Sequence, residues 1–176
     1  GTASEVVTNL SPLANWYGPD SCYRIQGVAT TLLVSHEAGW NMISSPLLMN
    51  DYSRCAVLTC GHGGNLFSYS YTGSYTLTDS LTPGKGCWFK FSSAGGTLFA
   101  GSPLPSLTVH LNNGWNMFGA VDHEVPAPSG GPIASSVFGY TNINGYEVAT
   151  ALKPGKAYWV KTDAALDVVL GPTATP

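Results

Sequence analysis

The sequence predicts an all-β protein in which two copies of one antiparallel β repeat pack with pseudo-two-fold symmetry as one barrel-like or sandwich-like domain. Three observations predict this fold: the composition, an internal repeat, and short segments in which apolar and polar residues alternate. Only 10% of the 176 residues are charged, against roughly 25% in an average soluble domain. Glycine (21 residues), proline (12), serine and threonine replace them, and 11% of the residues are aromatic. This mixture favours many short strands joined by turns over long helices.

The repeat appears when the chain is compared with itself. Residues 39–42 (GWNM) match residues 114–117, which lie 75 positions later. Residues 83–90 (PGKGCWFK) match residues 154–161 (PGKAYWVK), which lie 71 positions later. These matches occur in the same order and each contains a tryptophan, so they indicate an internal duplication.

The difference between the two spacings places four extra residues of the first copy within residues 46–65. We expect an N-terminal arm at 1–31, a first β repeat at 32–106, and a second β repeat at 107–176 that ends in a short C-terminal tail. Residues 102–106 (SPLPS) contain two prolines, as is typical of a short boundary between repeats.

Each copy is predicted to be a run of about five short antiparallel strands. Residues 32–43 and 107–118 alternate around a glycine, which predicts a strand, a tight turn and a returning strand. Tyr69 and Tyr75 flank a second glycine turn, which predicts a hairpin that recurs in the second copy. One such unit is marginally stable alone, so the two copies are expected to close around one shared core.

The Pro-Gly-Lys motif predicts a turn that leads into a strand. Proline presets the backbone at its own position of a type II turn, and Gly84 and Gly155 supply the positive φ required next. Residues 87–91 then alternate like a strand. Lys85 and Lys156 are expected to point to solvent or to cap neighbouring carbonyls.

The tryptophans raise the question of a binding site. Four of them recur at equivalent positions: Trp40, Trp88, Trp115 and Trp159. Recurrence in a duplicated core favours packing over ligand binding, because each ring can bury about 150–250 Å². Aromatic residues without a counterpart are therefore the predicted binding residues: Trp16, Tyr17, Tyr52 and Tyr71.

The four cysteines are Cys22, Cys55, Cys60 and Cys87. An even number in a chain with few charges favours disulfides and an oxidising compartment. A local Cys55–Cys60 bridge is the easiest to defend and would leave Cys22 with Cys87, but the sequence does not choose among the three pairings. A metal site with His62 is disfavoured because no second ligand pair follows at zinc-finger spacing.

The search for catalytic chemistry finds no motif. His36 and Glu37 begin a zinc-protease pattern that does not continue, and His36 aligns with a leucine of the second copy. Asp122, His123 and Glu124 are adjacent, so on a strand they would face alternate sides, and a solvated loop is expected. No pair of acids is marked for glycoside hydrolysis. We therefore expect no enzyme activity, no cofactor and no metal.

Charge and hydropathy exclude further classes. The net charge is −3 and the seven Lys and Arg residues are scattered, so no nucleic-acid surface is predicted. No apolar run approaches the roughly 20 residues that cross a bilayer, so no membrane span is predicted. The chain begins GTASEVV without a signal peptide or an initiator methionine, as expected of a processed or trimmed product.

The GWN motif, the tyrosine near a glycine turn, and PGKAYWVK together resemble a tandem repeat module of secreted and cell-surface bacterial proteins. The resemblance covers residues 32–171. It implies a secreted or cell-surface location in bacteria and supplies no catalytic residues. The first copy departs from the pattern at Cys87, where the second copy has Tyr158.

The expected function is that of a non-catalytic extracellular β module for surface attachment or assembly, such as a subunit of an extracellular filament or surface layer. Its partners would be other protein subunits or cell-surface components, and residues 1–31 could add a strand to a neighbour's open sheet edge. A carbohydrate-binding module, with glycans as partners, is the alternative. A small secreted hydrolase is the second alternative.

Overall fold

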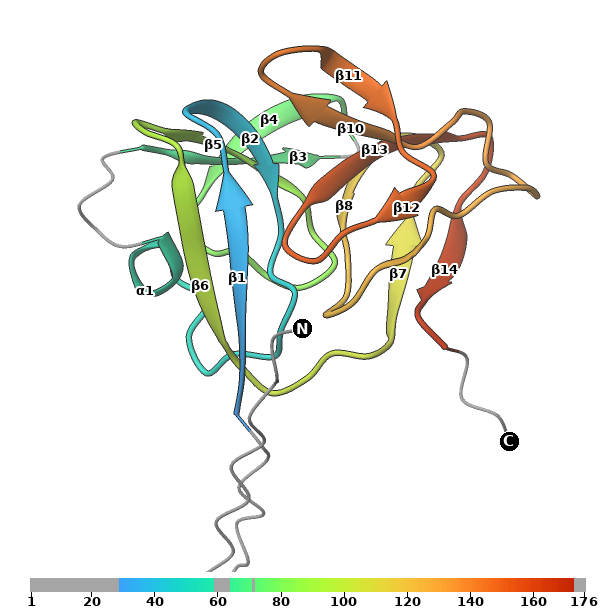
Figure 1. Cartoon of the computed structure of the whole chain (residues 1–176). Coiled ribbons are helices and arrows are strands. Elements are labelled where there is room, and N and C mark those ends of the chain that lie inside the picture. The colour runs from blue at the N-terminus through green and yellow to red at the C-terminus, as the bar shows by residue number, and fades with distance from the viewer. Residues whose placement is uncertain (1–28, 59–63, 71, 173–176) are drawn as a thin grey trace, which may run out of the picture.

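The computed structural model describes residues 29–58, 64–70 and 72–172. These residues form antiparallel sheets with one short helix, which confirms the all-β prediction. Figure 1 shows two lobes side by side, the first from blue to green and the second from yellow to red. The sheets pack in a sandwich-like manner and form no closed barrel among the described residues.

The first lobe contains two sheets. Its elements are β1 (Thr30–His36), β2 (Gly39–Ile43), α1 (Arg54–Leu58), β3 (Leu66–Ser70), β4 (Ser74–Thr78), β5 (Cys87–Phe91) and β6 (Gly95–Gly101). Strand β1 pairs with β6, and the other sheet has the order β2-β5-β3-β4. The helix lies within residues 46–65, where the extra residues of the first copy were predicted.

The second lobe repeats this topology. Its strands are β7 (Leu107–Leu111), β8 (Gly114–Gly119), β9 (Val125–Pro126), β10 (Phe138–Thr141), β11 (Gly145–Val148), β12 (Ala151–Leu152), β13 (Ala157–Thr162) and β14 (Leu166–Leu170). Strand β7 pairs with β14, and the four-stranded sheet has the order β8-β13-β10-β11. Each strand of the first lobe therefore has a counterpart, and the short β9–β12 pair corresponds to the isolated Ser53–Ser80 bridge of the first lobe.

The predicted strand–turn–strand unit is wrong in one respect, because its two strands belong to different sheets. The Asn41 side chain explains the connection. It accepts a hydrogen bond from the Glu37 amide (3.1 Å) and donates to the carbonyls of Glu37 (2.9 Å) and Gly39 (3.0 Å). Asn116 forms the equivalent bonds around Asn112. The buried amide thus closes the turn from inside, and the chain crosses from one sheet to the other.

The other local predictions are confirmed. Tyr69 faces Tyr75 across the β3–β4 hairpin, and β10–β11 repeats this arrangement. Gly84 and Gly155 have φ values of 76° and 74°, as the Pro-Gly turn requires. These local signals depend on a few neighbouring residues, which is why the sequence reveals them.

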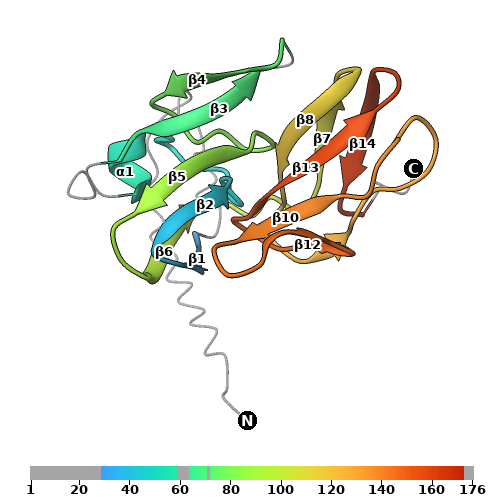
Figure 2. The same ribbon diagram turned by 90° about the horizontal axis from the view of Figure 1, so that it is seen from above.

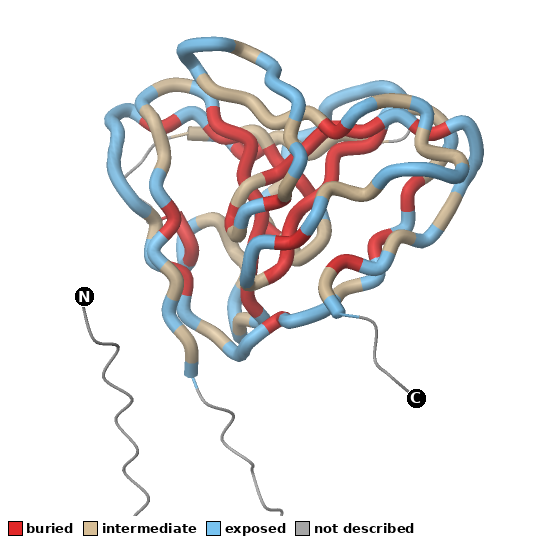
Figure 3. Tube along the Cα trace, turned by 45° about the vertical axis from the view of Figure 1, so that its right-hand side comes forward, coloured by how far each residue is buried: buried red, intermediate tan, exposed pale blue. Residues whose placement is uncertain are grey.

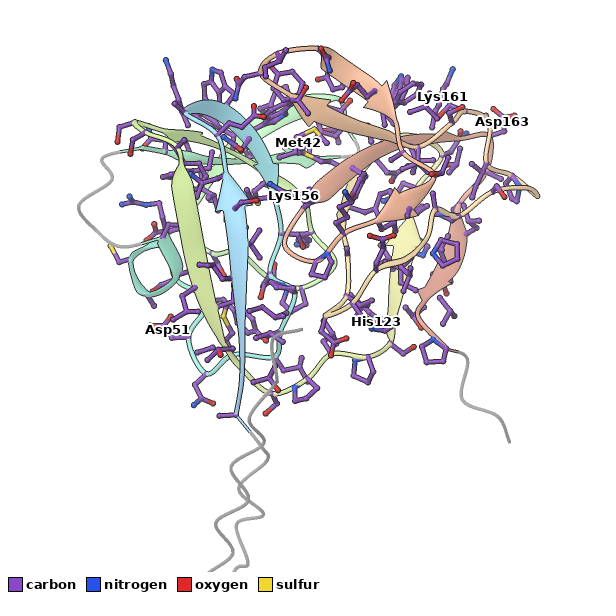
Figure 4. The ribbon with its side chains drawn as sticks, viewed as in Figure 1. Met42, Asp51, His123, Lys156, Lys161 and Asp163 are labelled. Carbon is purple, nitrogen blue, oxygen red and sulfur yellow. The ribbon has the colours of Figure 1, made fainter. Side chains whose placement is uncertain are left out.

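A single shared core was expected, but each lobe has its own. The buried cluster of the first lobe includes Leu47, Leu66, Leu81 and Phe89, and that of the second includes Leu111, Phe118, Leu152 and Val160. A smaller cluster of Met42, Met117, Ala157 and Trp159 joins the lobes. Figure 3 shows buried segments inside both lobes, and Figure 4 shows Met42 between them.

The contacts between the lobes are reciprocal. The Ser44 amide donates to the Gly155 carbonyl (3.1 Å), and the Gly119 amide donates to the Gly84 carbonyl (3.0 Å). Ser44 corresponds to Gly119 in the repeat, and Gly155 corresponds to Gly84. Strand β2 also contacts β10 while β3 contacts β8, and Figure 2 shows β2 beside β10. Such exchange of equivalent partners is the pattern of a two-fold axis.

Each Pro-Gly-Lys turn therefore binds the other lobe, and we call these two contacts together the clasp. Lys156 forms an isolated bridge with Ile43, and Lys85 forms the equivalent bridge with Phe118. The Lys156 ammonium donates to the Ser35 carbonyl of β1 at 2.6 Å, so this lysine caps a carbonyl as predicted. Figure 4 shows Lys156 beside β1. Burial lowers the pKa of Lys156 from its ordinary value.

The boundary between the repeats is held by the fold. Ser102 pairs with Leu48, and the amide of the buried Leu104 donates to the Asp122 carboxylate at 2.7 Å. The arm predicted at residues 1–31 lies almost wholly outside the described residues. Among those that are described, no helix is long and apolar enough to cross a membrane.

Candidate binding site

The outer faces of the two four-stranded sheets are aromatic. Along β5, Cys87 and Phe89 are buried against the first-lobe core, so Trp88 and Lys90 face the other way. The strand register places Trp40 opposite Lys90 and Met42 opposite Trp88. Directly opposed residues lie on the same face of a sheet, so these side chains share the outer surface.

Two open clefts lie where these aromatic faces meet, each with a volume of about 450 Å³. The first cleft is lined by Trp40, Phe67, Tyr75, Trp88, Tyr140 and Tyr146. The second cleft is lined by Tyr69, Tyr75, Trp115, Phe138, Tyr146 and Trp159. Every residue of one cleft has its repeat counterpart in the other, and both lobes contribute to each cleft. The pseudo-two-fold axis thus relates the two clefts.

The rings meet edge to face. The centroids of Trp40 and Trp88 are 6.3 Å apart with planes at 88°. Trp88 contacts Tyr140 across the lobes at 4.9 Å and 80°. In the second cleft the Trp115–Trp159 pair (6.2 Å, 86°) has nearly the same geometry. Perpendicular rings form the walls of a cleft rather than one flat platform.

The prediction that the recurring tryptophans pack inside a shared core is wrong for Trp40 and Trp115. Their exposed fractions are 38% and 42%. Trp159 is buried and Trp88 is half-buried, because both pack between the lobes beneath the clefts. The tryptophans recur because the same cleft is built twice.

Polar groups border the aromatic walls. Lys90 lies opposite Trp40 and Lys161 lies opposite Trp115, and both lysines are exposed. The residues that line the clefts carry no acidic or basic side chain. The indole N–H of Trp159 is buried and has no hydrogen-bond acceptor in the described part of the chain. The linings are thus uncharged, a lysine lies beside each cleft, and the second cleft has an indole N–H donor in its lining.

Tyr75 and Tyr146 line both clefts and lie near each other. Burial, followed by the proximity of Tyr75, raises the pKa of Tyr146 above its ordinary value. The Trp159 N–H acts in the opposite direction, so it lies near the Tyr146 hydroxyl, but the two groups do not reach hydrogen-bond geometry. These two tyrosines therefore form the partition between the clefts.

The residues predicted for binding do not lie in the clefts as far as the structure describes them. Tyr52 is half-buried, and its hydroxyl accepts a hydrogen bond from the Met49 amide at 3.0 Å. Trp16, Tyr17 and Tyr71 lie outside the described residues, so their roles stay predictions.

The cleft residues were missed because recurrence was taken as a sign of packing. One signal in the sequence could have found them. Trp88 alternates in phase with Lys90, so the tryptophan shares its face with a charged residue, and a face that carries a lysine is usually exposed.

The described residues include two of the four cysteines, Cys55 and Cys87. Cys87 is a buried free thiol, so the proposed Cys22–Cys87 bridge is wrong. Position 87 faces the closed core of the first lobe, where it packs as a small apolar residue. Cys55 is not free, but Cys22 and Cys60 lie outside the described residues, so the Cys55–Cys60 bridge stays a prediction.

Burial of Cys87 predicts a loss of stability at alkaline pH. Burial raises the pKa of its thiol from 9.0 to about 12. Above pH 9 the unfolded chain releases this proton and the folded chain keeps it until about pH 12. The free energy of unfolding should fall by up to about 1.4 kcal/mol per pH unit in this window. In urea denaturation between pH 8 and 10.5, the free energy of unfolding should fall less steeply with pH for Cys87→Ala than for the wild type. An equal dependence on pH in the two proteins would contradict a buried thiol.

The polar cluster at residues 122–124 has a structural role. Asp122 binds the Leu104 amide through one carboxylate oxygen and contacts the His123 imidazole (2.7 Å) through the other.

His36 stacks on Phe91 with centroids 3.6 Å apart. Within the described ranges, no group of three or more His, Cys, Asp or Glu residues is placed to hold a metal ion.

Comparison with known proteins adds no relative. No family model, curated protein or solved structure matches this chain. The resemblance to a secreted bacterial repeat module stays a prediction, and the function has to be argued from the clefts themselves.

Proposed function

We propose that this protein is a non-catalytic module that attaches to glycans through its two aromatic clefts. The observation that carries the proposal is the pair of equivalent clefts, in which large aromatic rings stay exposed in both copies. Folding normally buries such rings, and a patch of exposed ones marks an interaction site. The proposal joins the surface-attachment role expected from the sequence with its carbohydrate-binding alternative.

The chemistry of the lining favours a saccharide. A pyranose ring has an apolar face of C–H groups and an edge of hydroxyl groups. Its face can pack on an indole or phenol ring while its edge reaches hydrogen-bonding groups. A lining without charge suits a neutral ligand. A 2-acetamido sugar fits best, because its methyl group adds apolar contact with the ring walls.

The polar groups around the clefts complement this ligand. Lys90 and Lys161 can donate hydrogen bonds to hydroxyl groups from the rim. Within the described residues the Trp159 N–H has no acceptor, and a turn of the exposed Tyr146 ring would present it to a ligand oxygen. Satisfying a buried donor of this kind contributes about 1–3 kcal/mol.

The setting that fits this role is the outside of a cell. The low charge and the resemblance to secreted and cell-surface bacterial modules support it. In that setting the clefts would hold the protein, or a larger protein that contains it, on a glycan surface.

Chitohexaose, with cellohexaose as the sugar lacking acetamido groups, tests the proposal. Wild-type protein should bind chitohexaose in isothermal titration calorimetry. The double variant Trp40→Ala/Trp115→Ala should weaken binding at least about thirtyfold, because truncation of a central aromatic costs roughly 2 kcal/mol or more. Leu33→Ala is the matched control, since Leu33 is an exposed apolar residue of β1 that lines neither cleft.

Two results would contradict the proposal. One is that the wild type binds neither chitohexaose nor cellohexaose. The other is equal binding by the wild type and the double tryptophan variant. If the protein instead self-associates with rising concentration in size-exclusion chromatography, and the tryptophan variant does not, the exposed rings serve assembly.

A further inference from the structure

The geometry points to a protein that cross-links glycan chains: each cleft binds its own chain, and the two chains run in opposite directions. This inference rests on the proposed function, but it adds the number of sites, their relative orientation and the consequence for the ligand.

The first step is that the clefts are separate. Each has its own tryptophan pair, Trp40 with Trp88 in one and Trp115 with Trp159 in the other. Tyr75 and Tyr146 belong to both linings and divide them. The two clefts have equal volumes of about 450 Å³, so neither is a reduced copy of the other.

The second step is that a two-fold axis relates them. The hydrogen bonds between the lobes occur in reciprocal pairs, Ser44 with Gly155 and Gly119 with Gly84. The ring contacts do the same. Trp88 meets Tyr140 of the second lobe at 4.9 Å, and Trp159 meets Tyr69 of the first at 4.6 Å. Equivalent residues exchange places across such an axis, so a direction perpendicular to the axis in one cleft is reversed in the other.

The third step concerns the ligand. A saccharide chain is directional, with a reducing end and a non-reducing end. One straight chain that suits the first cleft would therefore enter the second cleft backwards. Two chains, one in each cleft and antiparallel to each other, satisfy both sites. A module with two such sites joins neighbouring chains of a glycan layer, and multivalent attachment of this kind exceeds the affinity of one site.

The test uses chitohexaose and a long, soluble N-acetylglucosamine polymer, glycol chitin. Calorimetry should give two chitohexaose molecules per wild-type protein. The single-cleft variants Trp40→Ala and Trp115→Ala should each bind one molecule. Wild-type protein should make a glycol chitin solution turbid, and both single variants should bind the polymer without turbidity. Leu33→Ala should behave like the wild type.

The failures of the two proposals are distinguishable. A stoichiometry of one in the wild type, abolished by either single variant, would overturn cross-linking and reveal one site that spans both clefts, while glycan binding would stand. Two sites without turbidity would also overturn cross-linking. The absence of binding in every arm would overturn the proposed function together with this inference.

Discussion

Gly155→Ala should lower the free energy of unfolding by about 2–5 kcal/mol, because it opens the clasp between the lobes. Gly155 has a φ of 74°, where an alanine costs roughly 1–2 kcal/mol. Its new Cβ would also lie 2.5 and 2.7 Å from the two methyl groups of Val34 in the other lobe. Overpacking of this kind adds about 1–3 kcal/mol. The midpoint of thermal unfolding should fall by roughly 10 °C.

Gly145→Ala is the matched control for this effect. Gly145 has nearly the same backbone conformation, with a φ of 76°, but nothing lies within 4 Å of a Cβ added there. This variant should lose only the backbone cost of about 1–2 kcal/mol. If the two variants unfold at the same temperature, the packing of the Pro-Gly-Lys turn against the other lobe contributes nothing and the clasp is wrong.

Gly119→Ser should be the most damaging substitution at the pseudo-two-fold axis, and Ser44→Gly should rescue it. These two residues occupy equivalent positions of the repeat and face each other. A Cβ at position 119 would overlap the Ser44 hydroxyl and lie 2.5 Å from its Cβ. The single variant is expected to lose about 3 kcal/mol or more of unfolding free energy, as overpacking in a rigid core does.

The exchange variant Ser44→Gly/Gly119→Ser restores one serine and one glycine at the axis. It should lose only about 1 kcal/mol relative to the wild type, the conformational-entropy cost of the new glycine at position 44. With losses of about 1 kcal/mol for Ser44→Gly alone and about 3 kcal/mol for Gly119→Ser alone, a double-mutant cycle by urea denaturation should give a favourable coupling of about 3 kcal/mol. Additive losses would show that the two positions are not equivalent, and the pseudo-symmetry would fail.

The sequence reveals the local elements of this fold well. The turns at Gly84 and Gly155 and the hairpins with paired tyrosines depend only on neighbouring residues. Their patterns can therefore be recognised within one copy of the repeat. Self-comparison reveals the duplication for the same reason. The topological equivalence of the lobes then follows from the matched strands.

Strand pairing and the packing of each strand face are harder to predict from the sequence. A strand–turn–strand pattern does not say whether the two strands pair with each other. Here the Asn41 side chain closes the turn, and the second strand belongs to another sheet. The pattern also does not say which face of a strand packs against its own lobe. Trp40 was placed in a core because it recurs in both copies, although the lysine opposite it lies on an exposed face.

The candidate site depends on both lobes, which is why sequence reasoning missed it. Tyr140 belongs to the second copy, yet it completes the cleft of Trp40 and Trp88. No spacing within one copy encodes that contact, because the two-fold arrangement creates it. Residues without a counterpart looked more distinctive, although the proposed binding surface is made from the repeated ones.

The most direct test of the account is the response of the five indole N–H signals to chitohexaose in ¹H–¹⁵N NMR spectra. We predict that the signals of Trp40 and Trp115, which line the two clefts, shift together as the sugar is added. Unchanged Trp40 and Trp115 signals, or a shift confined to Trp16, would contradict it.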